Sequence, residues 1–175
     1  GRVYALKAFQ IAEASSRTSR GTSLVNLVNL APGERINAVL PTPKLDMEGR
    51  LVLGTRQGSV KALRLKDLAN MRSNGLIIMD LKANDELVSV RTIQGKDDVI
   101  IITRNGKSIR FPCTQVPVRT RPAGGVKGIK LLDSDYVVGM EVMNAEDKIL
   151  VISEGGYGKL MSLAKYPRQR RNGQG

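Results

Sequence analysis

Short apolar runs alternate with turn residues along most of this chain. The runs are rich in β-branched side chains and too short for ordinary helices; they cover 51–53, 76–79, 99–103, 137–140 and 149–152. Turn signals follow or separate them at 56–58, 74–75, 105–106 and 155–156. Asn-Gly between apolar runs favours a hairpin, because both residues tolerate positive φ. The pattern predicts an all-β fold, with one helical turn at 66–71.

The same pattern recurs about every fifty residues. Thr55–Gly58 is matched by Thr103–Gly106 and by Ser153–Gly156, at steps of 48 and 50 residues. A second signature, a glycine, recurs at a different position within the repeat, at Gly21, Gly75, Gly125 and Gly173. The first of the three spacings between these glycines is the longest, which fits an inserted loop near 41–44. Repeats of four short strands are typical of propeller-like blades. We expect one repeat domain over 1–175, with blades at 1–45 (partial), 46–94, 95–144 and 145–175 (partial).

Composition narrows the class of function. Of 175 residues, 28 are Lys or Arg and 16 are Asp or Glu, so the net charge is +12 and a polyanionic partner is expected, nucleic acid first and an acidic membrane surface second. The chain has no His and one cysteine, Cys113, which excludes His-based catalysis, an intrachain disulfide and a cysteine-cluster zinc site. Aromatic residues are 3%, too few for a base-stacking platform. No apolar run is long enough to span a membrane, and the termini suggest a piece of a longer protein.

Basic residues gather in loops that occupy the same position within the repeat. Segments 15–22, 117–130 and 159–175 carry no acid, whereas acids recur at other turns: Asp46 and Glu48, Asp85 and Glu86, Asp97 and Asp98, Asp133 and Asp135, Glu146 and Asp147. Residues at the same position within each repeat occupy the same place on each blade, so we expect the basic loops to form one basic rim. The alternative is a set of solvated loops that only aid solubility. Arg binds phosphate oxygens as a fork, and small residues let backbone N–H groups approach phosphates. The predicted DNA contacts are Arg17, Arg20, Arg119, Arg121, Lys127, Lys130, Arg168, Arg170 and Arg171.

Several motifs resemble one known family. Gly1–Ala8 (GRVYALKA) looks like its recurrent GRVYxLK strand, and Glu154–Lys159 looks like its E-x-G-Y-G-K turn. The C-terminal stretch Gln169, Arg170, Arg171, Asn172, Gly173, Gln174 and Gly175 is similar to the GyrA-box Q-R-R-G-G-K-G, with departures at Asn172 and Gln174. Residues 119–128 look like a degenerate copy of that loop. Together these motifs cover the whole chain and resemble the C-terminal DNA-wrapping domain of DNA gyrase A.

The resemblance implies a β-pinwheel, a propeller-like disc whose blades exchange strands. The family domain has six blades, of which this chain would hold about four. It implies a basic rim that bends and wraps duplex DNA in support of negative supercoiling, in a cytoplasmic, nucleoid-associated enzyme. The partners implied are double-stranded DNA, gyrase B and a second copy of gyrase A. No cofactor or metal is expected here, and the holoenzyme's catalytic tyrosine and ATPase site would lie elsewhere. The box-like loop is read as a copy, with the true box outside this chain.

Three alternatives remain open. The matching domain of the A-type protein of topoisomerase IV shares the architecture but lacks a true box. A protein-binding propeller of the WD or kelch type is a different class, although its Trp-Asp and aromatic signatures are missing. An enzyme would need a motif such as a P-loop or G-x-S-x-G, and neither is present. The acids at 97–98 and 146–147 are read as solvated turn residues, Cys113 as a buried apolar residue, and Gly124 and Gly125 as turn glycines with positive φ.

Overall fold

The computed structural model describes residues 1–42, 48–71, 74–93 and 95–175. Part of the expected inserted loop (43–44) and Asp46 lie outside these ranges. The strands are β1 (Arg2–Val3), β2 (Arg50–Thr55), β3 (Ser59–Arg64), β4 (Leu76–Ile77), β5 (Leu87–Ile93), β6 (Asp98–Thr103), β7 (Ser108–Pro112), β8 (Val126–Lys127), β9 (Val137–Met143), β10 (Lys148–Ile152) and β11 (Gly158–Ser162). Short 3-10 turns cover Ala8–Gln10 (η1), Leu24–Asn26 (η2), Leu65–Leu68 (η3), Cys113–Gln115 (η4) and Leu163–Lys165 (η5). The predicted all-β fold is confirmed, and the predicted helical turn near 66–71 is η3.

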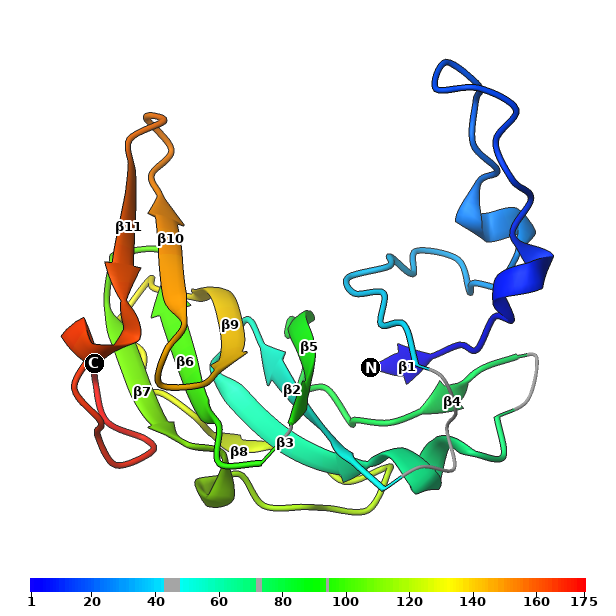
Figure 1. Ribbon diagram of the computed structural model, residues 1–175. Helices are drawn as coiled ribbons and strands as arrows, with labels where there is room; N and C mark the ends of the chain where they lie inside the picture. Colours follow the sequence, from blue (N-terminus) through cyan, green and yellow to red (C-terminus); the bar gives the residue numbers. More distant parts are fainter. Residues whose placement is uncertain (43–47, 72–73, 94) are drawn as a thin grey trace.

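The strands form antiparallel sheets that stand side by side along an arc (Figure 1). Their orders are β5-β2-β3-β8, β7-β6-β9, β10-β11 and β1-β4. The turns at 58, 106 and 156 each carry a glycine with positive φ, as the hairpin signals predicted. Segment 1–42 contributes only the two residues of β1 to a sheet, and its blue stretch extends away from the arc in Figure 1. The end of the segment returns to the sheets, where Asn37 Nδ2 donates to Leu87 O and Leu40 packs against the core.

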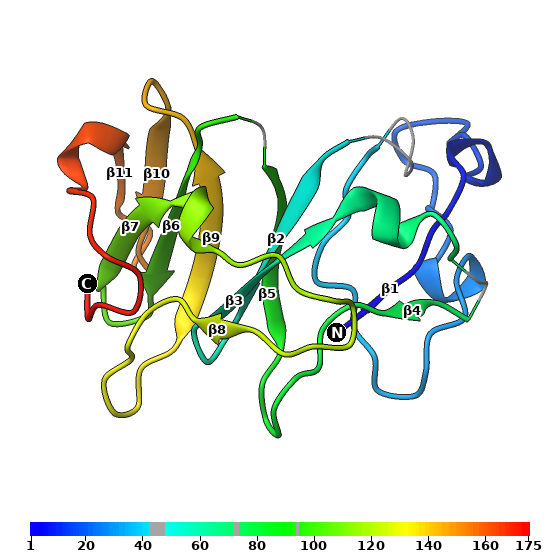
Figure 2. The same cartoon turned by 90° about the horizontal axis from the view of Figure 1, so that it is seen from below.

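Neighbouring sheets exchange strands. β8 follows β7 along the chain, yet it pairs with β3 of the preceding sheet, with Val126 opposite Val60 and Lys127 opposite Ser59. β4 pairs in the same manner with β1. Seen from below, β8 lies along β3, and the C-terminal segment lies beside β7 (Figure 2). The strand exchange implied by the resemblance is therefore present, and it makes a sheet from two successive repeats.

The core lies between the sheets, because each central strand buries both of its faces. Val52 of β2 packs in a cluster shared with β6, β7 and β9, whereas Leu51 and Leu53 pack toward β1 and β4. In β6 likewise, Ile101 faces the β2–β3 sheet and Ile100 faces β10 and β11. Burial on both faces explains why the sequence shows unbroken apolar runs instead of strict alternation.

The strand registers refine the predicted repeat. Arg119 N–H donates to Ala62 O, and Gln169 N–H donates to Arg110 O, so the two loops enter equivalent positions. A Cβ on Gly125 would lie 2.9 Å from Val60 O, and one on Gly175 would lie 2.8 Å from Ser108 O. The structural partner of Gly125 is thus Gly175, two residues beyond the predicted Gly173. The expectation of positive φ at Gly124 and Gly125 is wrong; Gly125 is required by this close approach of backbone to backbone.

Within the described part of the chain, no helix has the length and apolar character needed to cross a bilayer.

Candidate nucleic-acid interface

Two basic loops lie on the lower side of the arc in Figure 1. The first basic loop (117–130) runs from η4 to the segment after β8, and the second basic loop (168–175) follows η5. Each loop begins with a single parallel bridge, Val118 to Ala62 and Arg168 to Arg110. Each then closes a tight turn, through Ala123 N–H to Thr120 O at 3.1 Å and through Gly173 N–H to Arg170 O at 3.3 Å. The same local structure therefore presents both loops.

Backbone hydrogen bonds join the two loops edge to edge. Lys130 N–H donates to Gly173 O, and Asn172 N–H donates to Gly128 O, both at 2.8 Å. Arg171 strengthens the join, because its Nη1 donates to Lys127 O and its Nε donates to Gln115 O at 3.0 Å. Its backbone N–H also donates to Gln115 Oε1 at 2.8 Å. The loops thus form one continuous surface, which we call the basic edge.

Most of the predicted contacts on the basic edge are open to solvent. The exposed ones are Arg119, Lys127, Lys130, Arg168 and Arg170, whereas Arg121 and Arg171 are half-buried. Arg170 and Arg171 line a shallow depression of about 380 Å³ together with Gln115. Such an arrangement of guanidinium and ammonium groups can neutralise the phosphates of a nucleic acid without reading its bases.

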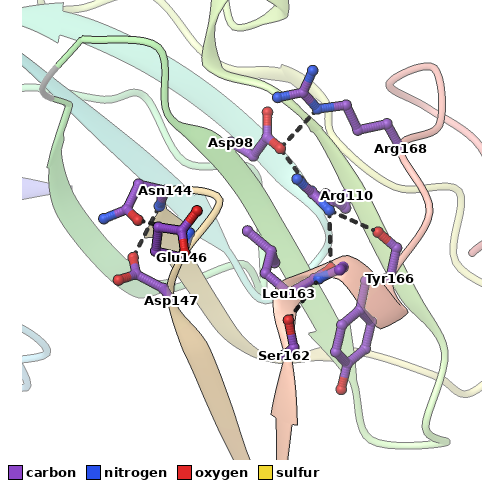
Figure 3. A network of polar contacts seen from close by, with 10 residues as sticks. Asp98, Arg110, Asn144, Glu146, Asp147, Ser162, Leu163, Tyr166 and Arg168 are labelled. Carbon is purple, nitrogen blue, oxygen red and sulfur yellow. Dashed lines mark hydrogen bonds and ion pairs between the residues drawn. The ribbon is translucent and has the colours of Figure 1, made fainter.

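Arg168 is committed in part to another partner. Asp98 Oδ2 accepts hydrogen bonds from Arg110 Nε at 2.6 Å and from Arg168 Nε at 2.9 Å (Figure 3). The Asp98 side chain is 3% exposed and that of Arg168 is 57% exposed. Asp98 was expected to be a solvated turn acid, and this expectation is wrong: it is a buried counter-ion shared by two arginines. Its other oxygen, Oδ1, has no hydrogen-bond partner among the described residues.

The remaining predicted contacts lie apart from the basic edge. Arg17 and Arg20 are exposed between η1 and η2, in the stretch of segment 1–42 that extends away from the sheets in Figure 1. A cluster of hydroxyls surrounds that turn, where Ser16 N–H donates to Ser19 Oγ at 2.9 Å. The structure therefore gathers seven of the nine predicted residues on one surface and leaves these two separate.

Acids at the other turns act in local structure. Asp85 Oδ1 accepts from Gln57 N–H, and Asp135 Oδ1 accepts from Asn105 N–H, so equivalent acids brace two hairpins. Burial acts to raise the pKa of Asp135, but hydrogen bonds from Thr103, Asn105 and Tyr136 leave that pKa below its ordinary value. Asp147 Oδ2 similarly accepts from Asn144 N–H at 2.9 Å. The described residues form no cluster of three or more potential metal-ligating side chains.

Two cations beneath the loops were not among the predicted site residues. Lys61 is fully buried, and its Nζ donates to Ile78 O, Arg121 O and Ala123 O, each at 2.7 Å. Arg110 Nη1 donates to Leu163 O at 2.9 Å and to Tyr166 O at 3.0 Å. The sequence held a signal for both, since each hairpin's second strand carries a basic residue within an apolar run. Burial lowers the pKa of Lys61, and the charge of Arg119 lowers it further.

Cys113 is buried at the start of η4, as expected for a small apolar residue. Burial, with the charges of Asp97 and Asp98 next in weight, raises the pKa of its thiol to about 12. The thiol is therefore neutral at physiological pH and poorly suited to act as a nucleophile.

A family model described as DNA gyrase C-terminal domain, beta-propeller, matches residues 1–43, 49–94, 97–144 and 147–175. The chain belongs to this family. The DNA gyrase A protein of Dehalogenimonas lykanthroporepellens is 40% identical over the whole chain, and that of Salmonella typhimurium is 38% identical over the whole chain. The chain spans about a fifth of these relatives, 22% and 20% of their lengths.

Solved structures of the gyrase and topoisomerase IV domains share the fold. A C-terminal domain of DNA topoisomerase IV superposes with a TM-score of 0.81 at 28% identity, over 89% of this chain and 49% of the other. A DNA gyrase A C-terminal domain superposes with a TM-score of 0.83 at 24% identity, over 100% of this chain and 56% of the other. The predicted propeller-like fold and the resemblance to the DNA gyrase A domain are both confirmed.

Proposed function

We propose that this gyrase-family domain binds duplex DNA along the basic edge, bends it and wraps it around the arc of sheets. It does so as the non-catalytic C-terminal part of a DNA gyrase A protein. In that enzyme the wrapped duplex supports ATP-dependent negative supercoiling in the cytoplasm, with gyrase B and a second copy of gyrase A as partners. The segment itself needs no cofactor for this role.

The observation that carries the proposal is the join between the two basic loops. Side chains on separate flexible loops would bind phosphates independently, whereas backbone bonds between 128–130 and 172–173 fix the loops in one surface. Exposed cations on a fixed surface can track a phosphate backbone over successive sheets. Bending the duplex costs elastic energy, which the additional phosphate contacts offset.

The first test removes charge from the first basic loop. Changing Arg119, Arg121 and Lys127 together to Ala should weaken duplex binding equally for unrelated sequences. It should also reduce the slope of log affinity against log salt by about 2 to 3, close to one unit for each phosphate that is no longer neutralised. Electrophoretic titration at several salt concentrations measures both quantities.

A matched control removes the same charge from other surfaces. Lys82, Lys96 and Lys148 are exposed and lie outside both basic loops, so their triple Ala variant should keep the salt slope close to that of the unaltered chain. Equal slopes for the loop variant and the unaltered chain would exclude the first basic loop from the interface.

A second candidate is the matching domain of the A-type protein of topoisomerase IV, favoured by the structural neighbour at 28% identity.

Binding alone and wrapping are distinguished by relaxing plasmid DNA with a type I topoisomerase in the presence of the chain. A wrapping domain constrains supercoils that remain after the protein is removed, whereas a domain that only binds leaves the plasmid relaxed.

A further inference from the structure

Lys61 occupies an unusual position for a lysine. It lies on β3, inside the β5-β2-β3-β8 sheet, and is paired in register with Leu53 of β2. Its side chain is 0% exposed, and lysine is rarely buried in this way without a carboxylate partner. None of the ion pairs among the described residues involves Lys61.

Among the described residues, the hydrogen bonds of the Lys61 ammonium group all go to backbone carbonyls. The ammonium group has three N–H donors, and all three are used, by Ile78 O just after β4 and by Arg121 O and Ala123 O in the first basic loop. Two of the three acceptors therefore belong to the tight turn 120–123. The ammonium group holds these two carbonyls pointing into the molecule. It thereby fixes the turn to the β5-β2-β3-β8 sheet, which carries Lys61.

The second basic loop is held differently. The residue equivalent to Ala62 is Arg110, which holds the carbonyls of Leu163 and Tyr166, in and just after η5 and ahead of that loop. The charge of Arg110 is balanced by Asp98 at 2.6 Å. The first basic loop thus rests on a buried cation with no ion-pair partner among the described residues, and the second rests on a neutralised one.

We propose that Lys61 is the positioning residue of the first basic loop, and that the phosphates of bound DNA act as the counter-ion of its ammonium. The proposal rests on the proposed function, since it names what organises one part of the basic edge. Lys61 itself is buried and does not touch the duplex. It holds the turn 120–123, which contains Arg121 and directly follows Arg119. Its charge adds to the charges of these two arginines in a region where burial weakens screening.

The test compares Lys61→Met with a variant that damages the same sheet without touching the loop. Leu53→Ala is that control, because Leu53 is fully buried opposite Lys61 and its side chain packs in the apolar core. If Lys61→Met does not fold, Lys61→Gln replaces it, since the amide keeps two donors without the charge. Both comparisons use the full chain, with unfolding followed in urea to record the stability of each variant.

Two readouts separate positioning from a merely structural role. In Lys61→Met the amide of Ala123 should exchange with solvent at least about tenfold faster than in Leu53→Ala, while the amides of 169–173 keep their protection. The salt slope for duplex binding should fall by about 2 in Lys61→Met and stay unchanged in Leu53→Ala. In a chain already carrying Arg119→Ala and Arg121→Ala, Lys61→Met should reduce the slope by less than half as much.

The outcomes that overturn the proposal are distinct. Equal exchange and equal slopes for Lys61→Met and Leu53→Ala would make Lys61 an ordinary core residue. Failure of the unaltered chain to bind duplex would overturn the proposed function and the counter-ion role together. The exchange of Ala123 would then still decide whether Lys61 holds the turn.

Discussion

At the scale of single residues, the basic edge depends on how buried charges are balanced. Asp98 balances two arginines at once, and only one of them, Arg110, is buried with it; the side chain of Arg110 is 10% exposed. The carboxylate therefore keeps a partner if Arg168 leaves, whereas Arg110 has no second carboxylate among the ion pairs of the described residues. This difference separates a structural arginine from one that is available to a ligand.

Asp98→Asn should destabilise the fold by about 3 kcal/mol, because it leaves the buried Arg110 guanidinium without its counter-ion. Arg168→Gln should cost less than about 1 kcal/mol, because an exposed ion-pair partner contributes little. Urea unfolding of both variants measures the two losses. Similar losses would show that Arg168 is as structural as Arg110 and would argue against its release to DNA.

Residue-scale roles were the hardest to predict from sequence. The basic character of 117–130 and 168–175 was visible, because charge and phase are properties of the chain itself. The burial of Lys61 and Asp98 was not, since it depends on carbonyls and guanidinium groups up to 70 residues away. The glycine spacing was offset by two for the same reason: only strand pairing shows that Gly175, and not Gly173, meets Ser108.

At the scale of elements, the exchanged strand β8 ties the first basic loop to the sheet before it. Gly128, just after β8, donates its N–H to Gly58 O at 2.7 Å. A Cβ at this position would lie 2.7 Å from Val60 Cγ1 and 2.8 Å from Ile101 Cδ1. The chain at Gly128 therefore occupies a space with room for backbone only, between two sheets of the core.

Gly128→Ala should destabilise the chain by about 1 to 3 kcal/mol, because the added methyl group must displace packed core atoms. Gly139→Ala is the matched control on β9, where a Cβ would meet no described atom within 4 Å. It should stabilise the strand by about 0.5 kcal/mol, since alanine loses less backbone entropy on folding. Thermal unfolding of the two variants checks the difference, and equal midpoints would contradict the packing described around β8.

The strands themselves were largely predictable, and their partners only in part. Apolar runs and turns ending in Gln-Gly, Asn-Gly or Gly-Gly located the hairpins β2–β3, β6–β7 and β10–β11, which are local in sequence. The opening residues 1–8 resemble the recurrent GRVYxLK strand of the family, yet only Arg2 and Val3 pair, with Ile77 and Leu76. The length of a strand depends on the partner with which it pairs. Local composition does not show which residues of so short a strand will pair.

At the scale of the whole molecule, curvature follows from the stacking of sheets along an arc. β5 and β9 of adjacent sheets are linked by Ser89 Oγ, which donates to Met140 O at 2.7 Å, and by Arg91 Nε, which donates to Glu141 Oε2 at 2.7 Å. Each added sheet extends the surface on which a duplex can lie. The bend imposed on DNA should therefore grow with the number of sheets engaged.

The isolated 175-residue chain should bend a short duplex less than a longer protein that contains further blades of this family. Resonance energy transfer between dyes on the duplex ends, at saturating protein and low salt, measures the bend. The Arg119, Arg121 and Lys127 triple Ala variant serves as the control that keeps the fold and weakens the grip. Equal bending by the short and long proteins would contradict a track made of several blades.

The bonds between Gly128 and Asn172, and between Lys130 and Gly173, join main chain to main chain. The spacing between successive groups of cations is consequently a property of how sheets pack, and side-chain reach adds little to it. A substitution deep between β2 and β9 could then alter the path of the double helix without touching a single charge. In such a protein, the packing distance between sheets in the core would set the curvature of the bound DNA.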